Sequence, residues 1–332
     1  MEGPEVPSGW RNRITEILGC AYPIVQGPMR LITLGSMAAA VSQAGGFGVI
    51  AASGLTPEEL RRELILARKL TDRPVGVNIP IYRPHAADSL EVAIEMGVKS
   101  VYTSAGNPAK LIDRIKARGL TIIHKISSLE MARKAEAAGV DAVVAMGFEA
   151  GGHIGRESIT TFCMIPQLVD ALTIPVIAAG GIGDGRGVVA AIALGAQGVE
   201  IGTRFVATQE CPVPSFFKEA VCSAFGDATL VLGKGAMPIR VLKNALTLRV
   251  AGMDESEADK AILAQGDAHY VQDGGDRDTA VMPCGQVVGL IRNIESVREV
   301  MAEIVNEARV VAGVISDRIG DDGNEMGACT SG

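Results

Sequence analysis

The chain has 332 residues, which is long enough for one large α/β barrel or for two smaller domains. Its formal net charge is −7 and it contains no basic block, so nucleic acid is not expected as a partner. No apolar run reaches the roughly 20 residues of a membrane span, and the N-terminus lacks the basic and apolar regions of a signal peptide. The six cysteines show no metal-ligand spacing, so no metal site is expected. These features predict a cytoplasmic enzyme that acts on a small molecule.

Short apolar runs rich in β-branched residues recur along the chain and predict eight buried strands. They cover residues 23–26, 47–50, 75–79, 100–103, 121–124, 142–145, 175–178 and 199–201. Helical patterns lie between them, over residues 35–44, 56–70, 86–96, 108–118, 128–138, 160–172 and 187–194. Eight strands that alternate with helices predict an α/β fold of the (β/α)8 TIM-barrel type. A doubly wound parallel sheet is the alternative, which the count of eight strands disfavours.

The regular alternation of predicted strands and helices ends near residue 211. Residues 212–289 show helical patterns at 213–224 and 255–264 between polar loops, and predict a smaller, mostly helical lid or substrate domain. A long amphipathic helix over 294–312 then returns to the barrel. We therefore expect a barrel built from 11–211 and 290–319, the lid from 212–289, and a disordered tail over 320–332.

Two glycine turns follow the last two predicted strands. Gly180 and Gly181 come after the seventh strand, and Gly202 and Thr203 come after the eighth. Glycine lets the backbone approach a ligand closely, and two successive βα turns can offer N–H groups to one phosphate. The alternative is that these glycines only shape tight turns.

Other candidate residues stand at the ends of the earlier strands, where chemistry collects in a barrel. They are Gly27, Pro28 and Met29 after the first strand, Asn78 in the third and Lys125 in the fifth. We expect Lys125 to point into the barrel mouth, where its charge could neutralise an anionic cofactor ring or substrate. His124, one residue earlier, should face the opposite side and be structural.

A single histidine, His153, lies in the glycine-rich segment 147–155 after the sixth strand. Its imidazole could transfer protons near neutral pH, and the glycines predict a flexible backbone that presents it to a substrate. The alternative is a loop histidine whose nitrogens bond to backbone carbonyls.

A phosphate site at strands seven and eight, with polar groups around the barrel top, suits flavin mononucleotide (FMN). The segment Gly181-Ile182-Gly183 is followed by Arg186 where a Rossmann fingerprint needs a third glycine. No dinucleotide domain is therefore expected. If NAD(P)H acts as a co-substrate, it must reach the flavin without that motif.

These motifs resemble the FMN-dependent barrel enzymes that group nitronate monooxygenases with enoyl-acyl-carrier-protein reductase II. The resemblance rests on PIVQGPM at 23–29, AVSQAGGFGVI at 40–50, RPVGVN at 73–78, GFEAGGHIG at 147–155, AAGGIGDGRG at 178–187 and GTRFVAT at 202–208. It implies a catalytic histidine at His153 and FMN phosphate at the two glycine turns. It also implies flavin contacts at residues 27–29, Asn78 and Lys125, to which we add Ala150 and Gly151.

Within the family, Lys125 and the run 147–149 resemble nitronate monooxygenases, whereas SAGNP at 104–108 and CGQVVGLI at 284–291 resemble the enoyl reductase. We expect oxidation of alkyl nitronates with O2 to a carbonyl compound and nitrite. The alternatives are NAD(P)H-dependent reduction of an enoyl thioester or of a quinone, and a flavin-binding protein without catalysis. Nucleotide dehydrogenases with the same phosphate turns need a cysteine in the loop after strand six, which 147–155 lacks. A homodimer is left open.

Overall fold

The computed structural model describes residues 7–233, 238–264 and 275–319. The tail predicted to be disordered, 320–332, lies outside the described residues. None of the helices within the described ranges is both long and apolar enough to cross a membrane.

Eight parallel strands form a closed barrel. They are β1 (Ile24–Gln26), β2 (Gly48–Ala51), β3 (Val75–Pro80), β4 (Ser100–Ser104), β5 (Thr121–Ile126), β6 (Ala142–Met146), β8 (Val176–Ala179) and β9 (Gly198–Ile201). Their spatial order is β1-β9-β8-β6-β5-β4-β3-β2, and a parallel bridge between Val25 and Phe47 joins β1 to β2. The predicted TIM barrel is confirmed, and a doubly wound sheet is excluded because such a sheet has two free edges.

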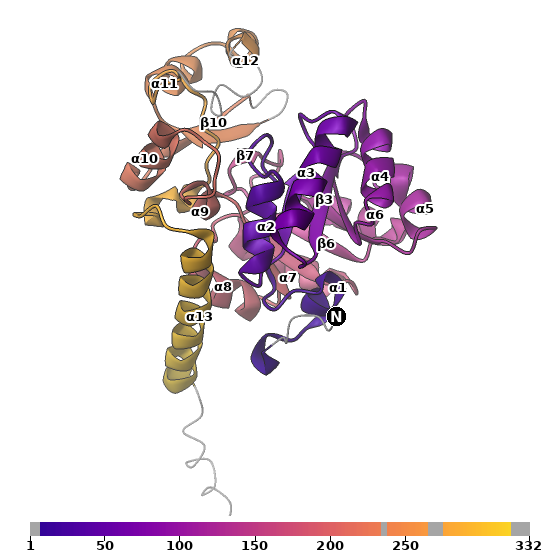
Figure 1. The fold of residues 1–332 in the computed structure, drawn as a ribbon. Helices are drawn as coiled ribbons and strands as arrows, with labels where there is room; N and C mark the ends of the chain where they lie inside the picture. Colours follow the sequence, from indigo (N-terminus) through magenta and orange to yellow (C-terminus); the bar gives the residue numbers. More distant parts are fainter. Residues whose placement is uncertain (1–6, 234–237, 265–274, 320–332) are drawn as a thin grey trace, which may run out of the picture.

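Helices cover the outside of this barrel (Figure 1). They are α2 (Gly35–Gln43), α3 (Pro57–Leu70), α4 (Ala86–Glu95), α5 (Ala109–Lys116), α6 (Leu129–Ala138), α7 (Thr161–Ala171) and α8 (Gly185–Ala193). Thr56 and Glu59 form a capping box that starts α3, with Pro57 at its first position. Each predicted helix between the strands is present, with ends that differ by a few residues.

Two apolar layers hold the barrel together. The larger lies between strands and helices, and the smaller fills the barrel interior with side chains such as Phe47, Tyr102 and Ile123. Ile14 and Leu18 of α1 (Arg13–Leu18) join the interior cluster, so this helix, which the sequence did not predict, closes the N-terminal end of the barrel. The opposite, C-terminal end remains for ligands.

We call residues 212–289 the lid segment; that it acts as a separate domain remains a prediction. Within its described residues the helices are α10 (Ser215–Ser223), α11 (Ala245–Ala251) and α12 (Glu255–Ala264), followed by the 3₁₀ turn η3 (Gln286–Leu290). It also contains two strands that the helical prediction missed, β10 (Thr229–Leu232) and β11 (Ile239–Leu242). These two strands form a three-stranded sheet with β7 (Gly152–His153), in the order β10-β11-β7. Figure 1 shows β10 and β7 at the C-terminal end of the barrel.

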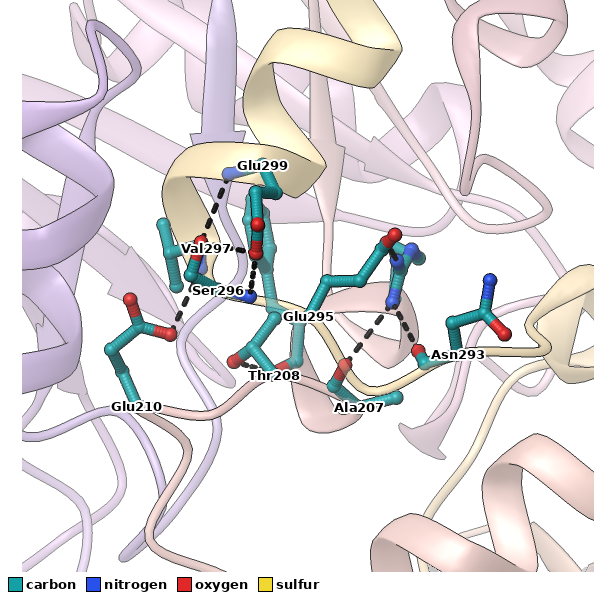
Figure 2. A network of polar contacts seen from close by, with 10 residues as sticks. Ala207, Thr208, Glu210, Asn293, Glu295, Ser296, Val297 and Glu299 are labelled. Atoms are coloured by element: carbon teal, nitrogen blue, oxygen red, sulfur yellow. Dashed lines mark hydrogen bonds and ion pairs between the residues drawn. The ribbon is translucent and has the colours of Figure 1, made fainter.

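The chain returns to the barrel through α13 (Val297–Ile319), which starts and ends later than predicted. Ser296 and Glu299 cap its first turn, and the Val297 amide donates to Glu210 at 2.9 Å, as Figure 2 shows. Gly185 of α8 permits close packing, because a Cβ there would lie 2.3 Å from the amide nitrogen of Ala308 on α13. The last helix is therefore fixed to the barrel at both its start and its middle.

Candidate active site

The two glycine turns form a cradle with free backbone donors. Gly180 and Gly181 have φ angles of +98° and +75°, and a Cβ on Gly180 would lie 3.0 Å from the amide nitrogen of Ala150. Within the described ranges, no group accepts a hydrogen bond from the N–H of Gly180, Gly181 or Gly202. Thr203 is the first residue of the short helix α9 (Thr203–Val206), where an N–H has no intrahelical partner. Backbone amides of this kind can bind a phosphate group.

The turn after β1 lies beside this cradle because β1 pairs with β9. The Gly27 amide donates to the Ile201 carbonyl at 2.8 Å, and a Cβ on Gly202 would lie 3.8 Å from Met29 Sδ. Residues 27–29, which the sequence assigns to a flavin ring, are therefore next to the residues that it assigns to the phosphate.

Asn78 of β3 is buried at the same end of the barrel. Its side-chain amide donates to the Tyr102 carbonyl at 3.3 Å and to Ser104 Oγ at 3.2 Å. Both acceptors belong to β4, so the neighbouring strand holds the orientation of this amide at the mouth.

Lys125 points into the barrel, as expected, but its charge is already paired. Its Nζ lies 2.5 Å from Oε1 of Glu200 on β9, a buried carboxylate that sequence reasoning did not single out. A lysine with an ion-pair partner offers less net charge to a ring or substrate than the sequence suggested. His124 faces outward, bonds to Thr103 Oγ1 at 2.8 Å, and has a pKa that burial lowers to about 4, which fits its structural reading.

His153 belongs to β7, which pairs with β11 of the lid segment through Ile239. Its side chain is exposed, yet surrounding protein atoms remove part of its hydration. This desolvation, together with the positive charges of Arg83 and Arg30, lowers the pKa of His153 below its ordinary value of 6.5. The shift favours the neutral imidazole, in which one ring nitrogen can donate and the other can accept a hydrogen bond.

The segment 147–155 is not the flexible loop that its glycines suggested. The guanidinium of buried Arg240 donates to the Phe148 carbonyl at 3.2 and 2.9 Å and lies 4.7 Å from the centre of the Phe148 ring. The Gln286 amide donates to the Glu149 carbonyl at 2.9 Å. A Cβ on Gly151 would lie 2.5 Å from the backbone of Cys284, so this glycine lets the residues just before η3 pack closely against it. The lid segment thus holds the histidine in place.

The Glu149 carboxylate serves the start of α7. It accepts hydrogen bonds from the Thr161 amide at 2.8 Å and from Thr161 Oγ1 at 3.1 Å. Thr161 Oγ1 also lies 2.8 Å from the Gly180 carbonyl oxygen, so the network supports the phosphate cradle. The Gly-Phe-Glu run at 147–149 therefore has a structural explanation and does not by itself select a nitronate.

Sequence reasoning missed Glu200, Arg240, Arg30 and Arg83. A glutamate inside the apolar strand 198–201 and an arginine inside Ile239–Leu242 were detectable signals, because buried charges need partners. Arg83 has no local pattern that would mark it. Among the described residues no group of His, Cys, Asp or Glu side chains is arranged to hold a metal ion.

The family model for nitronate monooxygenase matches residues 11–307. A related protein of Rhodococcus jostii (strain RHA1), named (3aS,4S,5R,7aS)-5-hydroxy-7a-methyl-1-oxo-octahydro-1H-indene-4-carboxyl-CoA dehydrogenase, is 32% identical and covers 90% of this chain and 96% of its own. FabK from Thermotoga maritima has a TM-score of 0.88 and 39% identity over 93% of this chain and 99% of its own. A nitroalkane oxidase from Streptomyces ansochromogenes has a TM-score of 0.81 and 28% identity over 92% and 100%. The chain belongs to the nitronate monooxygenase family of oxidoreductases.

Proposed function

We propose that this enzyme binds FMN at the C-terminal end of the barrel. The free amides of Gly180, Gly181, Gly202 and Thr203 would hold the phosphate. The ring would lie among Gly27, Pro28, Met29, Asn78, Lys125, Ala150 and Gly151. When bound, FMN supplies the acceptance and transfer of electrons, whereas the protein supplies orientation, proton handling and charge.

A substitution in the cradle tests this site. Gly181→Asp puts a side chain at a φ of +75° and a negative charge beside Glu149, whose Cβ lies 3.5 Å from the position of the new Cβ. We expect a folded protein that loses its FMN, measured by absorbance of the purified protein at the flavin bands. Gly119→Asp is the matched control, because Gly119 has a φ of +66° with no atom within 4 Å of an added Cβ. Full FMN content in folded Gly181→Asp would place the phosphate elsewhere.

The proposed reaction is oxidation of an alkyl nitronate with O2 to a carbonyl compound and nitrite. The observation that carries it is the position of His153, an exposed imidazole on β7 whose pKa desolvation and the positive charges of Arg83 and Arg30 lower. A small anion gains from the two positive charges, and the imidazole N–H can donate to a nitro oxygen without proton transfer. Nitronate oxidation also requires no second nucleotide to bind at the site, since it uses no nicotinamide nucleotide.

Reduction of an enoyl thioester by NAD(P)H is the second candidate. It is favoured by the higher identity to FabK, the enoyl-acyl-carrier-protein reductase II, at 39% against 28% for the nitroalkane oxidase over similar shares of the chain. In that reaction His153 would orient the thioester carbonyl. No observation favours quinone reduction, and the homodimer remains a prediction.

Anaerobic mixing distinguishes the two reactions. The oxidised enzyme is mixed with propyl-2-nitronate in one run and with NADH or NADPH in another, and flavin absorbance is followed. Bleaching by the nitronate and nitrite release on admission of air support the first proposal. Bleaching by a nicotinamide nucleotide, with recovery on adding crotonyl thioester and none with nitronate, would replace it by the second.

A further inference from the structure

Two charged side chains meet inside the barrel, below the mouth. Lys125 comes from β5 and Glu200 from β9, and two other strands, β6 and β8, separate them in the sheet. The ion pair, with its 2.5 Å separation, therefore spans part of the barrel interior. The side chains are 18% and 5% exposed, so solvent screens their charges only weakly.

The carboxylate of this pair lies directly against the turn after β1. A Cβ on Gly27 would be 3.2 Å from Glu200 Oε1, so the backbone of Gly27 packs closely against the carboxylate. Glu200 Oε2 and the hydroxyl of fully buried Tyr102 have no hydrogen-bond partner among the described residues. Desolvation and the charge of Glu200 raise the pKa of Tyr102 well above its ordinary value, so the phenol stays neutral beside the pair.

Protein charges near a flavin ring tune its electronics, and a reduced ring carries negative charge that a cation stabilises. An unpaired lysine at this depth would favour the reduced form. We propose that Glu200 is a positioning residue that holds Lys125 and offsets its charge, so that the pair, rather than Lys125 alone, sets the reduction potential of the flavin. The inference rests on the proposed FMN site.

The test is the flavin midpoint potential, measured by anaerobic dye equilibration with dithionite as reductant. Glu200→Gln keeps the shape and an acceptor for Lys125 but removes the negative charge. It should favour reduction at least tenfold, a rise of about 30 mV for a two-electron couple. Lys125→Met should shift the equilibrium by a similar factor in the opposite direction, because a carboxylate is left alone. The double variant should return to within about threefold of the wild type.

Residues that only support the fold would not be expected to shift the midpoint potential in opposite directions, with the two shifts cancelling in the double variant. Lys116→Met is the control, since Lys116 forms an equally short but exposed pair with Asp141 before β6, at the other end of the barrel. It should leave the potential unchanged. The shift in whichever single variant folds is decisive. Unchanged potentials in FMN-bound variants, or equal shifts of one sign, would overturn this inference alone. A folded wild-type protein that binds no FMN would overturn the proposed function as well.

Discussion

Desolvation and the positive charges of Arg83 and Arg30 favour the neutral form of the His153 imidazole, and this limits the roles open to it. A neutral ring can donate one hydrogen bond to an anion while the arginines supply the charge. Such a bond to resident or developing charge in a desolvated site is worth roughly 2–4 kcal/mol, or about 10²- to 10³-fold in rate. For the proposed reaction we therefore expect His153 to stabilise negative charge through a hydrogen bond.

His153→Ala should keep FMN and lose turnover by about 10²- to 10³-fold, because the cradle amides lie on other turns. FMN content and steady-state kinetics with the substrate that wild type accepts are the measurements. His85→Ala is the control, since His85 is exposed and its Nδ1 lies 3.3 Å from Asp88. Normal turnover in His153→Ala would remove the catalytic assignment while leaving the flavin assignment intact.

Arg83→Met should raise the pKa of His153 toward its ordinary value. Desolvation would still favour the neutral ring, but one of the two nearby positive charges would be gone. A raised pKa means that protonation sets in at a higher pH as the solution is acidified. The acid limb of the activity profile, and the His153 ring resonances in an NMR titration, should both move to higher pH. Lys69→Met, an exposed change at the end of α3, should move neither. A lower pKa in Arg83→Met would contradict the proposed electrostatics.

At the scale of elements, the short strand β7 couples the candidate catalytic residue to the lid segment. The segment 147–155 contains four glycines, which make its backbone flexible by themselves. Its pairing with β11 and the hydrogen bonds of Arg240 to the Phe148 carbonyl hold it in one conformation. The lid segment thus contributes to the site by holding a barrel loop.

Arg240→Met should loosen this loop. The two bonds from a buried guanidinium to one carbonyl, and its contact with the Phe148 ring, are lost, at a cost of about 2–4 kcal/mol. Amide hydrogen exchange across 147–155 should accelerate, and turnover should fall at least tenfold at unchanged FMN content. Lys243→Met is the control, because its 2.6 Å pair with Asp227 is exposed and such pairs contribute about 0–1 kcal/mol. Unaltered exchange in Arg240→Met would mean that pairing with β11 and the contacts of residues 284–286 hold the loop without the guanidinium.

The barrel was predictable because its strands are continuous apolar runs, which buried parallel strands require, and because glycines and caps mark the helix ends. The strands of the lid segment were missed for a physical reason. β7 has two residues, too few for any period, and β10 and β11 have only four residues each. Strand parity placed Lys125 inside the barrel, but its pairing with Glu200, 75 residues away, depends on barrel closure. No local pattern encodes that distance.

At the scale of the whole molecule, barrel and lid segment share one apolar core. The main cluster includes Phe217, Leu242 and Met282 of the lid segment together with the outer faces of the barrel strands. A separate, small cluster around Val241 and Leu246 belongs to the lid segment alone. Arg204, buried after β9, adds a 2.5 Å pair to Glu295 and donates to the carbonyl of Asn293. Figure 2 shows Glu295 beside the start of α13. Both chain connections of the lid segment are therefore fixed at one place.

A shared core predicts that the lid segment does not unfold by itself. Phe217→Ala removes a fully buried ring of α10 and should lower the free energy of unfolding by about 3–5 kcal/mol. Urea titrations followed by far-ultraviolet circular dichroism and by fluorescence of Trp10, the single tryptophan, report on the whole chain and on the N-terminal side of the barrel. Both transitions should move together to lower urea. Phe225→Ala is the matched control, because that ring is 81% exposed and packs against the Arg292 guanidinium, so neither transition should shift appreciably. If the dichroism of Phe217→Ala changed at low urea while Trp10 kept its wild-type midpoint, the lid segment would be an independent unit, and the core that joins it to the barrel would contribute little to its stability.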